Sequence, residues 1–381
     1  MSDFTLYAEH AVTPDGVRND VAVRVSAGRI VEVTTGMRSD SDHSAEWILP
    51  GFIDLHVHGG GGYSVHSPDE VAKLSTFLPQ TGVTAYLPTL STSAPDATLT
   101  FLRAVKDAQR GSSDAGAEIV GSHLEGPFLS KERKGAQPEA HIRVPDETEV
   151  DAWIEASQGT LSRVSLAPEV PNARRIIALL AAHGVGVSIG HSNATYEEAC
   201  EAVEWGAVST THTYNAMSPL DHRRPGVVGL ALTHPRVTAE LISDGVHVHP
   251  IAALLLIRAK GPERVAVVTD GVPPMALPSG THKWRDREVM SDGVAVRDKA
   301  GNLTGSATGM DGALRNLVNW GVSVQAAAQM LSTTPARLAR VDNRKGHIAT
   351  GYDADLVLLD DQLRPLSTFC RGNLTWSRNT L

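Results

Sequence analysis

Short apolar segments alternate with helix-like segments along most of this chain, and this alternation constrains the fold more than any other feature. Strand-like character occurs in eight segments, 52–57, 83–89, 118–124, 163–168, 185–190, 207–212, 237–243 and 264–269. Helical periodicity lies between most of them, at 67–78, 96–109, 172–184, 195–206 and 250–261. Such alternation predicts parallel strands joined by right-handed crossovers. Eight repeats in just over two hundred residues indicate an α/β fold, a (β/α)8 TIM-like barrel, rather than an open sheet.

Both ends of the chain have the alternating pattern of β-structure. It covers residues 4–12 and 20–33, and it returns at 345–362. A strand-rich insertion, roughly Thr281–Leu303, and two helical stretches separate the eighth repeat from the last segment. We therefore expect residues 1–50 and 343–381 to build one small sheet domain that flanks a barrel of residues 51–342.

Composition excludes several classes of protein. Of the 381 residues, 41% are hydrophobic, which is too many for a disordered chain. The formal net charge is -9 and no Lys/Arg-rich run stands out, so a nucleic-acid or membrane partner is disfavoured. Two distant cysteines fit a reducing compartment. The first residues do not resemble a secretory signal, and no apolar run is long enough to span a bilayer. These features together predict a soluble, cytoplasmic protein.

An H-x-H pair, His56 and His58, ends the first predicted strand. Residues i and i+2 of a strand point to the same face, so both imidazoles can reach one cation. Taken alone, the pair fits two polar residues at the mouth of a strand better than it fits a metal site.

The residues at the other strand ends favour a metal site. Glu125, His191, His212 and Asp270 follow strands three, five, six and eight, each at its carboxyl end. In a parallel barrel these ends share one face, where active sites of this fold are built. Imidazole and carboxylate ligands suit a divalent metal such as zinc, with iron or another transition metal as alternatives. His247 follows strand seven, and we expect it to contact substrate.

Several other residues near the strand ends are weaker candidates for a functional role. His249 precedes Pro250 and fits a loop or helix start, and Asp244 could orient a neighbour or simply serve a turn. The run Gly59–Gly62 fits a flexible loop that lets backbone approach a ligand better than a dinucleotide motif. Arg223 and Arg224 could be solvated or could grip an anionic group.

The chain resembles the N-acetylglucosamine-6-phosphate deacetylase family of the amidohydrolase superfamily. The motifs occur in the family's order and cover nearly the whole chain: PGFIDLHVHG, HLEGPF, GHSNAT, THTYNAMSP, DGVHV, TDG, LTGS and GYDADLVLLD. The resemblance implies a barrel with a β-sandwich made from both chain ends. It also implies hydrolysis of the acetamide of N-acetyl-D-glucosamine 6-phosphate, in amino-sugar catabolism or recycling.

The same resemblance implies roles for individual residues. Glu125, His191 and His212 would hold the principal metal, and a second metal, bridged through Glu125, could sit at His56 and His58. Asn215 and Ala216 would contact the sugar phosphate. The remaining pocket residues would be Ala136, Gln137, Asp244, Gly245, Val246, His247, Leu303, Thr304 and Gly305. Arg223 matches an arginine that grips the phosphate across a dimer interface, so a homodimer is expected.

Asp270 is the expected proton shuttle, accepting a proton from water and returning it to the departing amine. One departure from the family is Gln137, where many members have histidine, while His141 comes four residues later. Glutamine can bond a hydroxyl but carries no charge.

Two rival functions stay open at this point. A cyclic amidase of the dihydroorotase or hydantoinase kind commonly uses a carboxylated lysine as its metal bridge, yet no lysine ends the fourth strand. A non-catalytic protein on the same scaffold is the other rival, because fold alone does not imply function. Metal analysis with an acetate-release assay separates the three.

Overall fold

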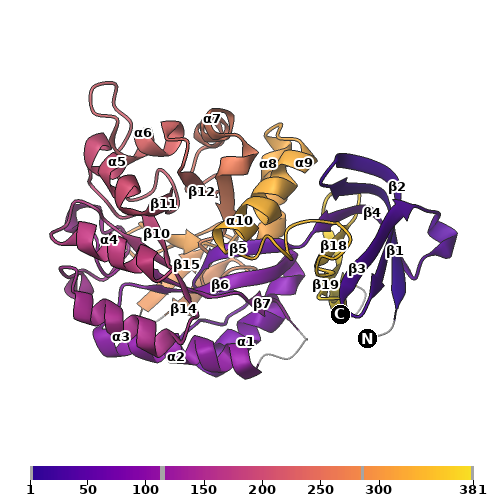
Figure 1. The fold of residues 1–381 in the computed structure, drawn as a ribbon, viewed down its shortest axis with the longest axis horizontal. Helices are drawn as coiled ribbons and strands as arrows, with labels where there is room; N and C mark the ends of the chain where they lie inside the picture. Colours follow the sequence, from indigo (N-terminus) through magenta and orange to yellow (C-terminus); the bar gives the residue numbers. More distant parts are fainter. Residues whose placement is uncertain (1–2, 112–115, 285–286, 379–381) are drawn as a thin grey trace.

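Eight parallel strands form a nearly closed barrel in the computed structural model, which describes residues 3–111, 116–284 and 287–378 (Figure 1). Their order around the sheet is sequential, from β5 (Phe52–Val57) through β6 (Val83–Ser91), β8 (Ser122–Glu125), β9 (Leu161–Leu166), β10 (Gly186–Ile189), β11 (Ala207–Thr210) and β12 (Thr238–Ile242) to β13 (Val265–Val268). Just beyond β13, the amide of Asp270 donates to His56 O at 2.9 Å, which ties the last strand to the first. The predicted α/β barrel is confirmed.

The predicted third strand, 118–124, is interrupted. It consists of β7 (Glu118–Ile119) and β8, and Gly121 between them has a φ of +156°. A Cβ atom at Gly121 would lie 2.3 Å from the side chain of Ser162, so the neighbouring strand approaches too closely for any other residue.

Helices surround the barrel. Those that the periodicity predicted are α1 (Pro68–Phe77), α2 (Pro95–Gly111), α4 (Ala173–Ala182), α5 (Tyr196–Trp205), α7 (Pro250–Lys260) and α8 (Met310–Asn319). The last predicted helix, over residues 323–340, is divided by a π-helical turn (Gln329–Thr333) into α9 (Val324–Ala328) and α10 (Thr334–Leu338). Two more, α3 (Glu147–Ser157) and α6 (Gly226–Thr233), fill crossovers for which no helix was predicted. The α6 helix is buried along nearly its whole length, so its sequence lacks the polar face that reveals an amphipathic helix. No helix in the described ranges is both long and apolar enough to cross a membrane.

Both chain ends meet in one seven-stranded sheet, as predicted. Its order is β20-β19-β18-β4-β1-β2-β3, with β1 (Phe4–Thr13), β2 (Gly16–Ser26), β3 (Arg29–Thr35), β4 (His43–Pro50), β18 (Leu356–Leu359), β19 (Pro365–Cys370) and β20 (Asn373–Ser377). The rings of Phe4 and Phe369 stack at 5.3 Å although two strands separate β1 from β19. Three strand spacings in a flat sheet would span about 14 Å, so this sheet curls around its own apolar core.

A partly buried ion network joins the barrel to the C-terminal segment. Glu118 of β7 accepts from Arg344 at 2.5 and 2.9 Å and lies 2.8 Å from the ammonium group of Lys345. Lys345, only 1% exposed, also pairs with Asp355. Burial opposes ionisation of Glu118, but these two cations outweigh it and lower its pKa to about 2.

The predicted insertion forms a four-stranded antiparallel sheet, β14 (Gly280–Trp284), β15 (Arg287–Ser291), β16 (Ala295–Arg297) and β17 (Leu303–Ser306). It is attached where the barrel ends, because Ser306 N donates to Asp270 O at 3.0 Å. The last of these strands, β17, therefore lies beside the mouth of the barrel.

Candidate metal centre and active site

The chain turns sharply where the predicted site residues leave the strands. His191, His212 and Asp270 follow β10, β11 and β13, and all three have positive φ, at +49°, +30° and +49°. Non-glycine residues rarely adopt this conformation, and it clusters at functional sites. The turns bring the three side chains, with Glu125 at the end of β8, to one face of the barrel.

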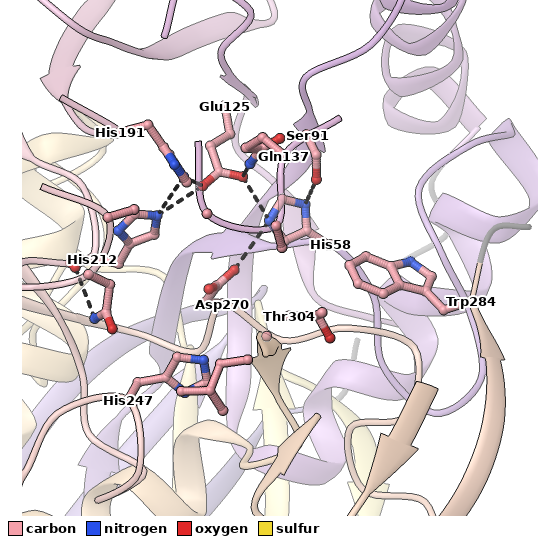
Figure 2. A pocket seen from close by; sticks show the side chains of 16 residues that line it. His58, Ser91, Glu125, Gln137, His191, His212, His247, Asp270, Trp284 and Thr304 are labelled. Carbon is pink, nitrogen blue, oxygen red and sulfur yellow. Dashed lines mark hydrogen bonds and ion pairs between the residues drawn. The ribbon is translucent and has the colours of Figure 1, made fainter. Parts of the chain in front are cut away.

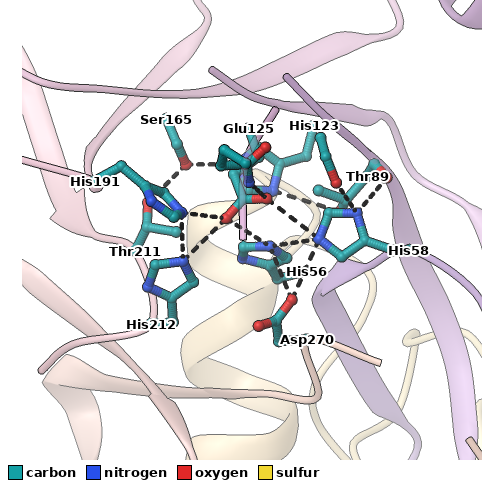
Figure 3. Close-up of polar contacts among 12 residues, drawn as sticks. His56, His58, Thr89, His123, Glu125, Ser165, His191, Thr211, His212 and Asp270 are labelled. Carbon is teal, nitrogen blue, oxygen red and sulfur yellow. Dashed lines mark hydrogen bonds and ion pairs between the residues drawn. The ribbon is translucent and has the colours of Figure 1, made fainter. Parts of the chain in front are cut away.

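Glu125, His191 and His212 form the tightest part of this cluster (Figure 3). One oxygen of Glu125, Oε1, lies 2.9 Å from the Nε2 atoms of both histidines. Those two nitrogens are 3.2 Å apart. All three side chains are at least 95% buried.

The tautomers of two histidines are fixed by backbone carbonyl groups. His191 Nδ1 lies 2.9 Å from Arg133 O, and His58 Nδ1 lies 2.9 Å from Thr89 O. A carbonyl only accepts, so each ring carries a proton on Nδ1 and turns Nε2 towards Glu125, where that nitrogen can hold either a second proton or a metal ion. Lone pairs facing a carboxylate need a cation between them, and an imidazole whose other nitrogen donates to the backbone is the usual metal ligand. The donor set therefore fits a divalent metal ion.

A second group of possible ligands lies beside the first. His56, His58 and Glu125 have ligand atoms within 4.8 Å of one another. His58 Nε2 lies 3.3 Å from Glu125 Oε2 and 3.2 Å from Asp270 Oδ1, and His56 Nε2 lies 3.5 Å from the same Asp270 oxygen. Glu125 thus faces both groups, as a bridging ligand would.

Charge compensation sets the protonation of the carboxylates. Burial alone would raise the pKa of Glu125 and of Asp270, but the adjacent imidazoles lower both. For Glu125 the opposing groups are His56, His191 and His212. Asp270 is therefore ionised at neutral pH and ready to accept a proton.

Gln137 lines the pocket and also contacts the cluster itself. Its Nε2 atom donates to Glu125 Oε2 at 2.5 Å, and its Oε1 atom accepts from Thr92 N at 2.9 Å. The amide is therefore engaged by the carboxylate at the centre of the cluster. His141 is half-buried and is not among the residues that line the pocket.

A pocket of about 200 Å³ opens onto the cluster (Figure 2). Predicted residues that line it are His58, Glu125, Ala136, Gln137, His191, His212, Asn215, Ala216, His247, Asp270, Leu303, Thr304 and Gly305. Ser91, Gly135 and Trp284 also line it and were not predicted. Trp284 was inconspicuous because it lies in the insertion and belongs to none of the strand-end motifs. No lysine lines the pocket in the described part of the chain, which removes the basis of the cyclic-amidase reading.

His247 is presented to the pocket by its own turn. Asp244 Oδ2 lies 2.6 Å from His247 Nδ1, and Asp244 Oδ1 accepts from the amides of Val246 and His247 at 2.9 and 2.8 Å. Burial lowers the pKa of His247, but Asp244 outweighs it and the net shift is upward. Asp244, Gly245 and Val246 do not line the pocket themselves. Asp244 thus orients its neighbour, and Nε2 of His247 is left for a ligand.

Arg223 does not line the pocket of its own chain. It lies on the exposed loop between β11 and α6, where its amide donates to Asp221 Oδ1 at 2.9 Å. Together with Arg133 and Arg224 it lines a separate surface pocket of about 450 Å³.

One of the weaker signals is confirmed by the structure, and a second gains a structural explanation. His249 is the N-cap of α7, with its side chain accepting from Ile251 N. The run Gly59–Gly62 also has a packing role, and its expected role as a flexible, ligand-facing loop stays a prediction. The run packs on the protein itself, where a Cβ atom on Gly60 or Gly61 would overlap Phe77.

A layer of buried polar residues beneath the cluster was not predicted. Glu240 of β12 is fully buried, and its Oε1 atom lies 2.7 Å from Arg163 Nη2. His123 lies beside His56, with 4.8 Å between ring centroids. The sequence did offer one signal for this layer, because Glu240 and Arg163 are charged residues inside otherwise apolar strand segments. Such residues are almost never fully buried unless they are paired.

Comparisons with known proteins agree with this geometry. The model of the amidohydrolase family matches residues 47–375. An N-acetylgalactosamine-6-phosphate deacetylase from Escherichia coli O157:H7 is 38% identical over 97% of this chain and 98% of its own length. An N-acetylglucosamine-6-phosphate deacetylase from Bacillus subtilis (strain 168) is 34% identical over 99% of this chain and 96% of its own.

A solved structure is similar over the whole chain. It is a mutant of N-acetyl-D-glucosamine-6-phosphate deacetylase from Mycobacterium smegmatis, in complex with N-acetyl-D-glucosamine-6-phosphate. The two superpose with a TM-score of 0.93 at 30% identity, covering 99% of this chain and 100% of that one. The family match, the aligned deacetylases and the shared architecture together show that this chain belongs to the amidohydrolase family.

Proposed function

We propose that this protein is a metal-dependent deacetylase that converts N-acetyl-D-glucosamine 6-phosphate to D-glucosamine 6-phosphate and acetate, in amino-sugar catabolism or recycling. One observation carries the proposal: Glu125, His191 and His212 converge at the pocket while Asp270 faces the same space. Relatives with this activity in their names align along the whole chain, which supports the choice of substrate.

In this proposal Glu125, His191 and His212 hold the principal divalent ion, and His56 and His58 hold a second one with Glu125. When bound, the ion supplies Lewis acidity, which makes an amide carbonyl more electrophilic and water easier to deprotonate. Histidine and carboxylate ligands favour Zn²⁺, with Fe²⁺ as its main competitor. Elemental analysis of the purified protein decides the metal and whether each subunit holds one or two.

Asp270 moves the proton. Its carboxylate accepts a proton from water as the water oxygen attacks the carbonyl carbon. The carbon–nitrogen bond then breaks, and Asp270 returns the proton to the nitrogen, which would otherwise depart as a poor leaving group. Asp270 Oδ1 lies within 3.5 Å of the Nε2 atoms of His56 and His58, so the carboxylate faces the ion that these two residues would hold.

The pocket walls position the sugar. His247, with its Nδ1 atom engaged by Asp244, offers Nε2 to a hydroxyl group. Asn215 and Ala216 contact the sugar phosphate, and Ala136, Gln137 and Leu303 to Gly305 complete the wall. Binding energy from these remote groups orients the acetamide over the reacting centre.

The assembly in this proposal is a homodimer in which Arg223 grips the phosphate at the partner's pocket. Exposed apolar side chains support an interface on this face: Leu220, near Arg223, is 52% exposed, and Ile251 and Leu255 on α7 are 68% and 51% exposed. The α6 helix that follows the Arg223 loop packs against α7. The expected cytoplasmic location is part of the same proposal.

An acetate-release assay on zinc-loaded protein tests the activity. We expect N-acetylglucosamine 6-phosphate to be hydrolysed much faster than unphosphorylated N-acetylglucosamine. N-acetylgalactosamine 6-phosphate belongs in the same assay, because the relative from Escherichia coli O157:H7 is named for that epimer. Faster hydrolysis of the galacto epimer would correct the substrate but keep the chemistry. No acetate from either phosphorylated sugar would overturn the proposal.

A further inference from the structure

One buried carboxylate, that of Glu240, contacts two of the proposed metal ligands. Glu240 lies in the middle of β12 and is fully buried inside the barrel. Its Oε2 atom accepts from the backbone amide of His212 at 3.1 Å and lies 3.4 Å from His56 Nδ1. A single oxygen atom therefore contacts a ligand from β5 and a ligand from β11.

The contact with His56 determines where that imidazole carries its proton. An ionised carboxylate only accepts hydrogen bonds, so the nitrogen that faces it must be the protonated one. With the proton on Nδ1, the Nε2 lone pair of His56 points towards Glu125 and Asp270, at 3.6 and 3.5 Å. The opposite tautomer would place a hydrogen atom where a cation must sit.

His56 differs in this respect from His58 and His191. Those two rings are fixed by backbone carbonyl groups, which no side-chain substitution removes. The ring of His56 depends on a side chain from another strand. Its backbone amide donates to Asp54, but that contact leaves the orientation of the ring unset.

A purely structural ion pair would not account for the geometry. Arg163 neutralises Glu240 through Oε1 at 2.7 Å, and the same guanidinium nitrogen donates to Ser209 and Ser188 at 2.5 and 3.3 Å. That pairing uses only one side of the carboxylate. The other oxygen is directed at the two ligand residues.

We propose that Glu240 is a positioning residue for the metal centre: its carboxylate fixes the tautomer of His56 and the turn that carries His212. The inference rests on the metal-dependent function proposed above, but it is tested by metal binding and not by deacetylation. A carboxylate behind a ligating histidine raises the basicity of the ligand and holds its ring.

The variant Glu240→Gln keeps the size of the side chain and replaces one acceptor oxygen by a donor. Whichever way the amide turns, a donor then faces either Arg163 or the contacts of His212 and His56. We expect metal-free Glu240→Gln protein to bind added Zn²⁺ roughly 10- to 100-fold more weakly than wild type. On the substrate, kcat should fall while KM stays nearly constant, because the proposed sugar contacts lie elsewhere.

The matched control is Ser209→Ala, which removes a hydrogen bond to Arg163 but leaves both oxygens of Glu240 in place. Its Zn²⁺ affinity should equal that of wild type even if its melting temperature falls. Zn²⁺ affinity of Glu240→Gln equal to wild type, or an equal loss in Ser209→Ala, would overturn the inference.

A second measurement needs no variant. Nitrogen-15 NMR of Zn²⁺-loaded, histidine-labelled wild-type protein reports which ring nitrogen of His56 carries a proton. We expect the proton on Nδ1, and a proton on Nε2 alone would overturn the inference even if Glu240→Gln fails to fold. Loss of deacetylase activity in every form, with Zn²⁺ binding behaving as described, would count against the proposed function and not against the role of Glu240.

Discussion

The Nε2 atoms of His191 and His212 lie 3.2 Å apart, closer than two lone-pair nitrogens stay without a proton or a cation between them. The two residues come from adjacent strands, β10 and β11, and both leave their strands with positive φ. The fold therefore holds the two rings together by backbone geometry. A bound cation would offset the repulsion between the two nitrogen atoms.

The first prediction follows from this arrangement. Removing metal with a chelator should lower the melting temperature by several degrees, and added Zn²⁺ should restore it. A ligand at a thousand times its Kd stabilises the folded state by about 4 kcal/mol. The measurement is differential scanning calorimetry with and without Zn²⁺. Glu125→Gln should lose the response to Zn²⁺, and a wild-type protein whose melting temperature ignores metal would contradict the assignment.

Asp270→Asn tests the proton shuttle. Asparagine keeps the shape of the side chain but cannot accept a proton at neutral pH, so kcat should fall roughly 10²- to 10⁴-fold. Zn²⁺ content and substrate affinity, measured by elemental analysis and calorimetry, should change far less. Turnover close to that of wild type would remove Asp270 from this role.

Arg223→Ala tests the arginine on the exposed loop. Loss of a charge-assisted contact should reduce kcat/KM for the phosphorylated sugar roughly 10- to 100-fold and leave the unphosphorylated sugar nearly unaffected. Arg224→Ala, next to it on the same loop, is the matched control and should behave like wild type. Equal losses on both sugars would argue against a phosphate contact.

Glu118→Gln tests the ion network between barrel and C-terminal segment. The folded pKa of Glu118, about 2, lies below its ordinary value of 4.5, so its contribution to stability is present above pH 4.5 and is lost as pH falls towards 2. The shift corresponds to roughly 3 kcal/mol. Urea unfolding should therefore show a less stable variant at pH 7, with a difference that shrinks below pH 4.5.

The control for this experiment is Glu288→Gln. Glu288 also pairs with a lysine, Lys299, but both side chains are well exposed. Exposed pairs contribute little to stability, so this variant should follow the wild-type curve at every pH. A Glu118→Gln curve parallel to wild type over the whole pH range would contradict the assigned pKa.

Strand-end motifs made the centre of the site predictable. His56, His58, Glu125, His191, His212 and Asp270 converge because all parallel strands of a barrel end at one face, so locating the strands located the cluster. The resemblance added Asn215, Ala216 and Leu303 to Gly305, which the structure places along the pocket. Their roles, like the domain limits at residues 50 and 342, stay predictions.

Other features of the structure could not be predicted, because no pattern in the sequence indicates them. The α6 helix is buried on all sides, so it has no amphipathic period. Trp284 reaches the pocket only because the insertion folds back onto the barrel mouth. The contact of Gln137 with Glu125 depends on side-chain orientation, which spacing along the chain does not set. Arg223 lies outside the pocket of its own chain, so a single subunit leaves its expected contact untested.

The seven-stranded sheet has a consequence for biosynthesis. Strand β4 is flanked by β1 on one side and by β18 on the other, so one of its neighbours is translated some three hundred residues later. Until then β4 presents an open hydrogen-bonding edge, the kind of surface that recruits foreign strands. A nascent chain must therefore shield this edge, or tolerate it, throughout translation of the barrel.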